Sequence, residues 1–246
     1  MSDNNFNDIL NQVKGLKKEI TFFSPISNKE LKIYPLSLKQ QKDILENTLS
    51  SSLSLLFFNN CIFNIIKENF NGSVKDLDTI DRVSISLSLR NKISNTYKEG
   101  NTEVNLSEII ERNNTPITFE PKEVITGDFT FKLKKPTLEL DNKVNNILLR
   151  KYKASKIDES NVNNVISDLY VYELIKFIDT LEFGENVIKV EDNINNTIKI
   201  LNEIDSDNFK EVFDYINELR DIESSLTKIP NSEDNISITP DFFIVQ

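Results

Sequence analysis

The spacing of apolar residues changes along this chain, and that change constrains the fold more than any other feature of the sequence. Before Pro136, short runs in which apolar and polar residues alternate are interleaved with helical patterns. After Pro136, apolar residues recur every three to four positions almost throughout. Alternation is typical of strands, whereas the longer spacing places side chains on one face of a helix. The sequence therefore predicts an α+β fold with two regions, 1–135 and 136–246.

The N-terminal region begins with a predicted β-hairpin. Residues 19–23 and 31–34 are short alternating runs, and the segment between them is rich in turn-forming residues. Pro35 ends the second run. Ser37 predicts the N-cap of a helix that begins near Leu38, because a serine hydroxyl accepts a hydrogen bond from the first turn.

The most apolar window of the chain is 53–66, and its apolar residues have helical spacing. This window is too short to span a bilayer, so it predicts a buried helix that ends before Asn71-Gly72. The only cysteine, Cys61, lies within the window and has no partner for a disulfide. We expect it to be a buried structural thiol, in a protein of a reducing compartment.

The segment 84–89 alternates serine with isoleucine or leucine and fits either a strand or a helix. Charged residues on both sides favour a helix, with Thr79 as its N-cap and Asp81 and Arg82 in its first turn. A short helix over 106–112 follows.

A second hairpin is predicted near the middle of the chain, with strands in 116–125 and 129–134 around Thr126-Gly127-Asp128. The clean alternation of 129–133 indicates that one face of this strand meets solvent.

The C-terminal region is predicted to be mostly helical, with a short extended tail. Apolar spacing predicts helices over 138–152, 161–181, 193–204 and 209–226. Gly184 is placed like a signal for the end of a helix. The tail carries Phe242 and Phe243, which would each forgo about 1.5–3 kcal/mol if left in water. They are therefore expected to dock on the body of this chain or on a partner.

The composition excludes several kinds of chemistry. The chain has no histidine, so catalytic systems and zinc sites that need histidine are excluded. Its glycines are isolated, which leaves no glycine-rich loop for phosphate. Asp76, Asp78 and Asp81, and likewise Asp205 and Asp207, lack the glycine and the glutamate that a calcium loop needs. Helix capping and solvated turns explain these aspartates better.

Charge and termini indicate which partners to expect. The net charge is -10 and the isoelectric point is near 4.8, so a nucleic acid would be repelled. Lys14, Lys17 and Lys18 adjoin Glu19 and are expected to form a solvated face. The polar, acidic N-terminus shows no secretory signal pattern. We therefore expect no nucleic acid, no membrane, no cofactor and no metal.

Several stretches, in order along the chain, carry a resemblance to a known family. They are 24–39, then Leu77, Asp81 and Leu89-Arg90, then 177–181, 209–213 and the Asp241-Phe242-Phe243 ending. Together they resemble the baseplate hub and hub-assembly proteins of T-even-type contractile-tailed phages. The chain departs from that pattern at Asn28, where the family has a glycine, and around Pro230 and Thr239-Pro240.

The resemblance implies a non-enzymatic structural or assembly protein of a contractile tail baseplate that acts through protein–protein interfaces. Its implied partners are other baseplate and tail proteins, and no small-molecule substrate is expected. The implied location is the virion, or the host cytoplasm during assembly. The candidate partner contacts are Phe22, Tyr34, Lys39, Phe242 and Phe243.

Two other functions stay open at this point. One is an intracellular helical adaptor or regulatory protein unrelated to phage tails. The other is a hydrolase that uses two carboxylates, which would require two acidic side chains to converge in a pocket. Whether a baseplate protein of this kind stays in the particle or acts only during assembly is also open.

Overall fold

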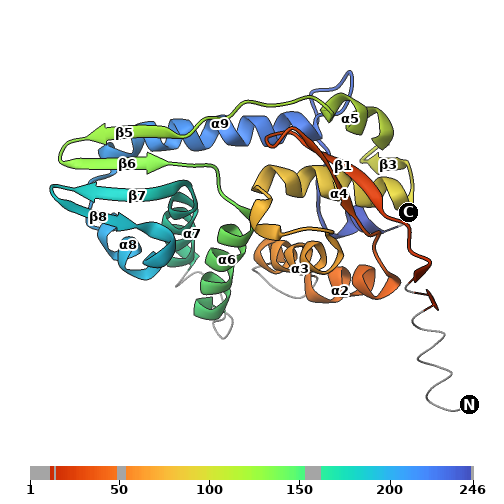
Figure 1. The fold of residues 1–246 in the computed structure, drawn as a ribbon, viewed down its shortest axis with the longest axis horizontal. Helices are drawn as coiled ribbons and strands as arrows, with labels where there is room; N and C mark the ends of the chain where they lie inside the picture. Colours follow the sequence, from red (N-terminus) through yellow and green to blue (C-terminus); the bar gives the residue numbers. More distant parts are fainter. Residues whose placement is uncertain (1–11, 14, 49–53, 153–161, 245–246) are drawn as a thin grey trace, which may run out of the picture.

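The structure, a computed structural model, describes residues 12–13, 15–48, 54–152 and 162–244. Figure 1 shows an elongated molecule with a four-stranded sheet at one end and a two-stranded hairpin toward the other. The longest described helix, α9 (Lys210–Thr227), begins at the sheet and runs toward the hairpin end. Helices and antiparallel strands are mixed along the chain, which confirms the predicted α+β class.

The predicted N-terminal hairpin is present. Strand β1 (Ile20–Ser24) pairs antiparallel with β2 (Lys29–Ile33). Asn28 has a φ of 53°, a left-handed conformation that asparagine tolerates better than most residues, which explains why an asparagine can occupy this position of the turn.

The predicted cap of the first helix, α2 (Leu38–Thr48), is confirmed. The Gln40 backbone N–H donates to the Ser37 hydroxyl at 3.2 Å, and the Ser37 backbone N–H donates to Gln40 Oε1 at 2.9 Å. These two hydrogen bonds form a capping box that fixes where the helix begins.

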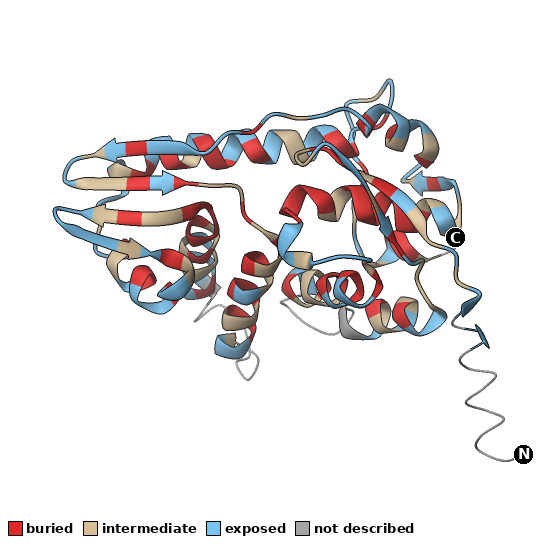
Figure 2. Cartoon of the chain, viewed as in Figure 1, coloured by how far each residue is buried: buried red, intermediate tan, exposed pale blue. Residues whose placement is uncertain are grey.

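The other helices of the N-terminal region agree with the sequence pattern: α3 (Ser54–Asn69), α4 (Thr79–Ile93) and α5 (Leu106–Asn113). The ambiguous segment 84–89 is helical and lies in α4, which is buried on nearly every side (Figure 2). A helix that is buried all round needs no single apolar face, so its serines and leucines can alternate. The N-cap is Asp78, one residue before the predicted Thr79, and its backbone N–H donates to Asp81 Oδ2 at 2.9 Å.

A hairpin that the sequence pattern did not reveal lies between α4 and α5. It pairs β3 (Thr96–Glu99) with β4 (Thr102–Asn105), and Gly100 in its turn has a φ of 57°. Each strand buries a single apolar side chain, Tyr97 or Val104. One apolar residue per strand produces no alternation that could be recognised.

The second predicted hairpin is confirmed, although its first strand starts later than expected. Strand β5 (Lys122–Thr126) pairs with β6 (Phe129–Leu133), and 116–121 form no strand. In β6 Phe131 and Leu133 are buried while Lys132 is exposed, so one face of this strand meets solvent as predicted.

The predicted helix over 161–181 is wrong at its C-terminal end. Helix α7 (Val162–Phe177) stops at Phe177, and β7 (Ile178–Phe183) and β8 (Asn186–Lys189) extend the sheet in the order β5-β6-β7-β8. Gly184 has a φ of 58° and lies in the turn between β7 and β8, so it does not end a helix. Strand β7 pairs with the edge of β6 that β5 leaves free, and this pairing satisfies the backbone N–H and C=O groups along that edge. A longer α7 would leave these groups of β6 without partners.

The remaining elements complete the C-terminal half. They are α6 (Leu138–Tyr152), α8 (Ile194–Leu201) and the short 3-10 turns η1 (Val74–Asp76), η2 (Val190–Asp192), η3 (Ser206–Phe209) and η4 (Pro240–Phe243).

Two hydrophobic cores hold the chain together. One lies between the four-stranded sheet and helices α6 to α9, and the other lies among the β1–β2 hairpin, α2 to α5 and the C-terminal tail. The predicted division of the chain into 1–135 and 136–246 does not coincide with these two cores. Strands β5 and β6 contribute to the first core, and Phe242 and Phe243 contribute to the second. Helix α4 belongs to both cores and joins them.

Candidate functional site

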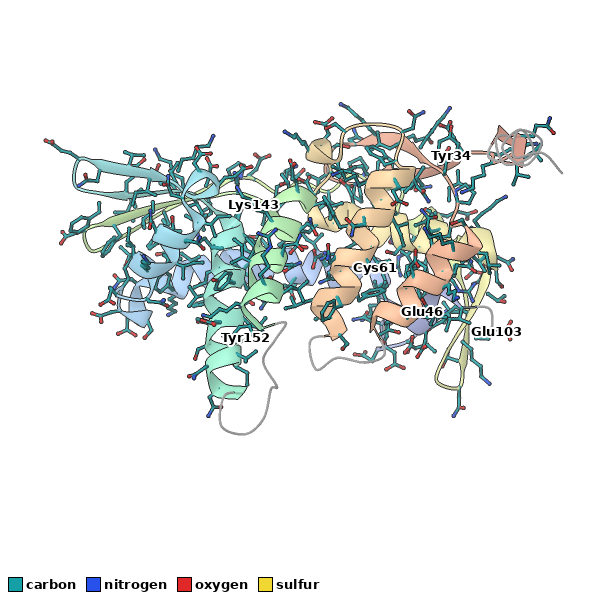
Figure 3. All side chains as sticks on the ribbon, turned by 90° about the horizontal axis from the view of Figure 1, so that it is seen from below. Tyr34, Glu46, Cys61, Glu103, Lys143 and Tyr152 are labelled. Atoms are coloured by element: carbon teal, nitrogen blue, oxygen red, sulfur yellow. The ribbon has the colours of Figure 1, made fainter. Side chains whose placement is uncertain are left out.

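The segment between β2 and α2 is partly at the surface. Tyr34 is 37% exposed and lies where the hairpin leads into α2 (Figure 3). Leu38, the first residue of α2, is 83% exposed, and Lys39 beside it is also exposed. Leu36 between them packs against the N-terminal core. We call Tyr34, Leu38 and Lys39 the entry surface.

Buried amides hold the backbone of this segment in place. The Tyr34 backbone N–H donates to the Asn69 carbonyl at 2.9 Å, and Asn69 Nδ2 donates to the Tyr34 carbonyl at 3.2 Å. Gln40 Nε2 in turn donates to Asn69 Oδ1 at 2.9 Å. Because Gln40 and Asn69 are both buried, these bonds are shielded from water and fix the segment against the end of α3.

Three of the five predicted partner contacts are not available at the surface. Phe22 is 1% exposed because β1 turns it into the N-terminal core against Phe70. Phe242 and Phe243 are 0% and 1% exposed. The hypothesis that these three side chains touch a partner is corrected by their burial.

The C-terminal phenylalanines dock on the body of this chain, which was one of the two possibilities left open. The Phe242 ring meets Tyr97 edge-on with centroids 4.9 Å apart, and the Phe243 ring lies 6.1 Å from Phe58. The tail thereby packs across α3 and the β3–β4 hairpin, and it is a structural strap rather than a free end.

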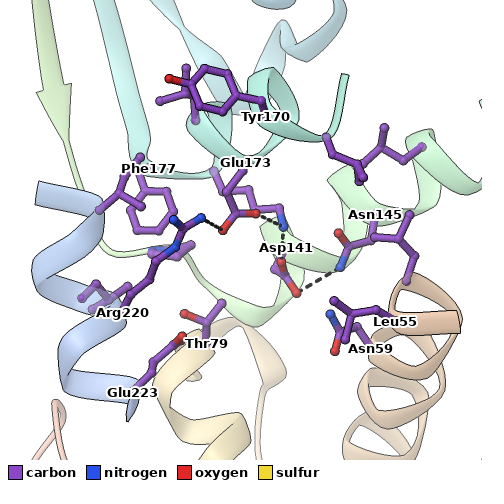
Figure 4. A pocket seen from close by; sticks show the side chains of 18 of the residues that line it. Leu55, Asn59, Thr79, Asp141, Asn145, Tyr170, Glu173, Phe177, Arg220 and Glu223 are labelled. Carbon is purple, nitrogen blue, oxygen red and sulfur yellow. Dashed lines mark hydrogen bonds and ion pairs between the residues drawn. The ribbon is translucent and has the colours of Figure 1, made fainter. Parts of the chain in front are cut away.

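A cleft of about 520 Å³ lies where α3, α4, α6, α7 and α9 meet (Figure 4). Three apolar side chains at this cleft are strongly exposed: Leu55 at 66%, Ile166 at 58% and Tyr170 at 52%. We call them the cleft rim.

A network of ion pairs forms the floor of the cleft. Asp141 accepts hydrogen bonds from Arg82 Nη1 and from Lys176 Nζ, each at 2.7 Å. Lys176 Nζ also donates to Glu173 Oε2 at 2.7 Å, and Arg220 lies 3.7 Å from the other oxygen of Glu173. Asn145 Nδ2 also donates a hydrogen bond to Asp141 Oδ2 at 3.1 Å.

Burial and pairing act in opposite directions on these groups. Burial by itself raises the pKa of Asp141, but Arg82 and Lys176 outweigh it and hold that pKa at about 2. Burial by itself would lower the pKa of Lys176, but the carboxylates of Asp141 and Glu173 outweigh this effect. The pKa of Lys176 is therefore raised above its ordinary value. The carboxylate and the ammonium therefore stay charged near neutral pH and neutralise one another.

The sequence did not reveal this network. Arg82 was interpreted only as a first-turn residue of α4, and Asp141 and Lys176 were not singled out at all. Asp141 is 59 residues away from Arg82 along the chain, so no local spacing marks the pair. Only the packing of α4, α6 and α7 brings these side chains together.

The aspartates near the start of α4 act as capping groups, as the sequence predicted. Lys135 Nζ lies 2.8 Å from Asp78 Oδ2. Asp81 is fully buried, and desolvation raises its pKa to about 6. Among the described residues, no group of three or more acidic or cysteine side chains could hold a metal ion.

Cys61 lies on α3 on the side of α2 and is half-buried rather than fully buried (Figure 3). Desolvation, with smaller contributions from Asp43 and Glu68, raises the pKa of its thiol to about 11. The thiolate is therefore scarce near neutral pH, which agrees with a structural role.

Comparison with known proteins finds no match for this chain, whether among protein-family models, curated proteins or solved structures. Within the described part of the chain, none of the helices combines the length and the hydropathy that crossing a membrane requires.

Proposed function

We propose that this chain is a non-enzymatic structural or assembly protein of a contractile phage tail baseplate, either a hub component or a hub-assembly factor. It acts through protein–protein interfaces, in the virion or in the host cytoplasm during assembly. The observation that carries the proposal is the exposure of Tyr34 and Leu38 in the stretch that resembles the family.

Most of the other residues that carry the resemblance are explained by the fold. Leu77, Asp81, Leu89 and Arg90 are at most 2% exposed, and they serve the packing and capping of α4. Phe177 and Phe209 are buried in the core beneath the sheet. The entry surface differs from them, because packing within this chain does not account for its exposed apolar side chains.

Leaving such side chains in water is unfavourable. Full burial of a leucine or an aromatic side chain contributes about 1.5–3 kcal/mol, and Leu38 at 83% exposure forgoes most of this. The two hydrogen bonds that join the Tyr34 backbone to Asn69 hold this backbone in place. A partner that covers Tyr34 and Leu38 would recover this free energy, and Lys39 beside them offers a charge for specificity.

The proposal is tested by co-purification and by particle composition. The chain is co-expressed with the hub and tail proteins of its source phage, and the complex is isolated through a tag on a hub protein. Leu38→Asp is expected to reduce recovery of the chain about tenfold. Val187→Asp is the matched control, since Val187 is an apolar residue of β8 that is 63% exposed and distant in sequence.

Quantitative mass spectrometry of purified tails then separates the two forms of the proposal. A stoichiometric amount indicates a resident hub component, and absence from particles that require the chain indicates an assembly factor. Failure to bind any hub or tail protein would overturn the proposal in both forms and favour an adaptor unrelated to tails. If Val187→Asp reduced recovery as much as Leu38→Asp, the loss would not be specific to the entry surface, and the proposal would no longer include this surface as the contact.

A further inference from the structure

We propose that the cleft between α3 and α7 binds an uncharged, apolar peptide segment of a partner protein. The inference rests on the cleft rim, the paired charges and two asparagine amides, and it does not depend on the phage-tail proposal. The cleft is separate from the entry surface, since none of Tyr34, Leu38 and Lys39 lines it.

The rim is built from two helices, α3 and α7. Leu55 and Asn59 are four residues apart on α3 and so lie on one face, and the same holds for Ile166 and Tyr170 on α7. The Tyr170 ring packs against Phe213 with centroids 4.8 Å apart, so its orientation is fixed before anything binds. Each of the two helices thus presents an apolar side chain to the cleft.

The charge pattern of the cleft argues against an ionic ligand. The basic residues that line it, Arg82, Lys176 and Arg220, equal in number the acidic residues Asp141, Glu173 and Glu223. Most of them are joined in the ion-pair network described above. A phosphate or a metal ion would have to break these pairs, whereas an uncharged ligand leaves them intact.

Two amides supply the polar contacts that a peptide backbone requires. Asn145 is 1% exposed, and its Oδ1 has no hydrogen-bond donor among the described residues, although its Nδ2 is bonded to Asp141. Figure 4 shows Asn145 on one side of the cleft and Asn59 nearby on α3. A backbone N–H of the bound segment that reaches Asn145 Oδ1 would satisfy this buried acceptor.

The exposure of the rim favours a protein segment over a small molecule. Leu55, Ile166 and Tyr170 are each more than half exposed, so much of their apolar surface lies outside the cavity. A small ligand enclosed in the cavity would leave that surface in water. A segment that inserts a side chain and rests its flanks on the rim covers both.

The test uses capped hexapeptides and methyl-labelled protein studied by NMR. The neutral probe is acetyl-GSLLSG-amide, and the charged probes replace its two leucines with two lysines or two glutamates. The neutral probe is expected to shift the methyl signals of Leu55 and Ile166 and the side-chain amide signal of Asn145, in a saturable manner. Ile166→Asp is expected to weaken this binding about tenfold.

The matched control is Ile125→Asp, because Ile125 is 69% exposed on β5 and does not line the cleft. This control variant is expected to bind the neutral probe as the unaltered chain does. Absence of shifts at millimolar probe, or equal binding of the charged probes, would overturn the inference. Rim signals that move with protein concentration alone would overturn it too, because the occupant would then be a second copy of this chain.

Discussion

The side-chain amides of Gln40 and Asn69 exchange two hydrogen bonds across 29 residues of sequence. Gln40 Nε2 donates to Asn69 Oδ1 at 2.9 Å, and Asn69 Nδ2 donates to Gln40 Oε1 at 3.1 Å. The same Nδ2 also donates to the carbonyl of Tyr34. This reciprocal pair connects the first turn of α2 to the last turn of α3 and thereby positions the entry surface.

Asn69→Ala is expected to lower the free energy of unfolding by about 2–3 kcal/mol, because it removes two hydrogen bonds of the buried Gln40 amide and the side-chain hydrogen bond to the Tyr34 carbonyl. Urea denaturation followed by circular dichroism measures the change. Asn64→Ala, at an exposed position of the same helix, is the control and should change stability by less than about 0.5 kcal/mol. Equal effects of the two substitutions would contradict the role assigned to the amide pair.

Asp141→Asn is expected to destabilise the protein by about 3–5 kcal/mol, because Lys176 would be left buried without its main counter-charge. The exposed Asp221→Asn is the matched control and should have little effect. The pKa of Asp141 is about 2 in the folded state against 3.8 for an unperturbed aspartate. Its contribution to stability is therefore complete above about pH 4 and is lost as pH falls toward 2.

Asp81 is expected to produce the opposite dependence on pH. Its folded pKa of about 6 lies above the unperturbed value of 3.8, so the folded state binds its proton more tightly. This contribution to stability is complete below about pH 4 and is lost as pH rises through 6. Urea denaturation between pH 4 and 7 should show this loss, and Asp81→Asn should remove it. An unchanged slope in the variant would assign the dependence to another group.

Phe242 and Tyr34 are expected to respond oppositely to truncation, although both were predicted as partner contacts. Phe242→Ala removes a ring that is fully buried and should cost about 3–5 kcal/mol of stability. Tyr34→Ala removes a side chain at the surface and should change stability by less than about 0.5 kcal/mol while weakening partner binding. Thermal denaturation together with the co-purification assay separates the two effects. A stable Phe242→Ala variant would contradict the strap role of the tail.

Local pattern was sufficient where an element depends on its own residues. The β1–β2 hairpin and β6 show the alternation that places apolar side chains on one face, and both are present. Ser37 has a hydroxyl within reach of the first turn of α2, so the start of that helix is also local information. The surface position of Lys39 is local information too, because a lysine side chain keeps its charged end in water.

Only the tertiary structure decided which segments pair over long distances. The predicted helix over 161–181 includes the start of β7, yet 178–183 form a strand because the edge of β6 offers backbone hydrogen-bonding groups that only a strand can pair with. Arg82, Asp141 and Lys176 come from three helices, and no local signal connects them. Phe242 could dock on this chain or on a partner, and the structure shows that it docks on this chain with its ring against Tyr97. Sequence periodicity reports the faces of one element, whereas ion pairs, sheet edges and core cavities exist only once several elements have packed.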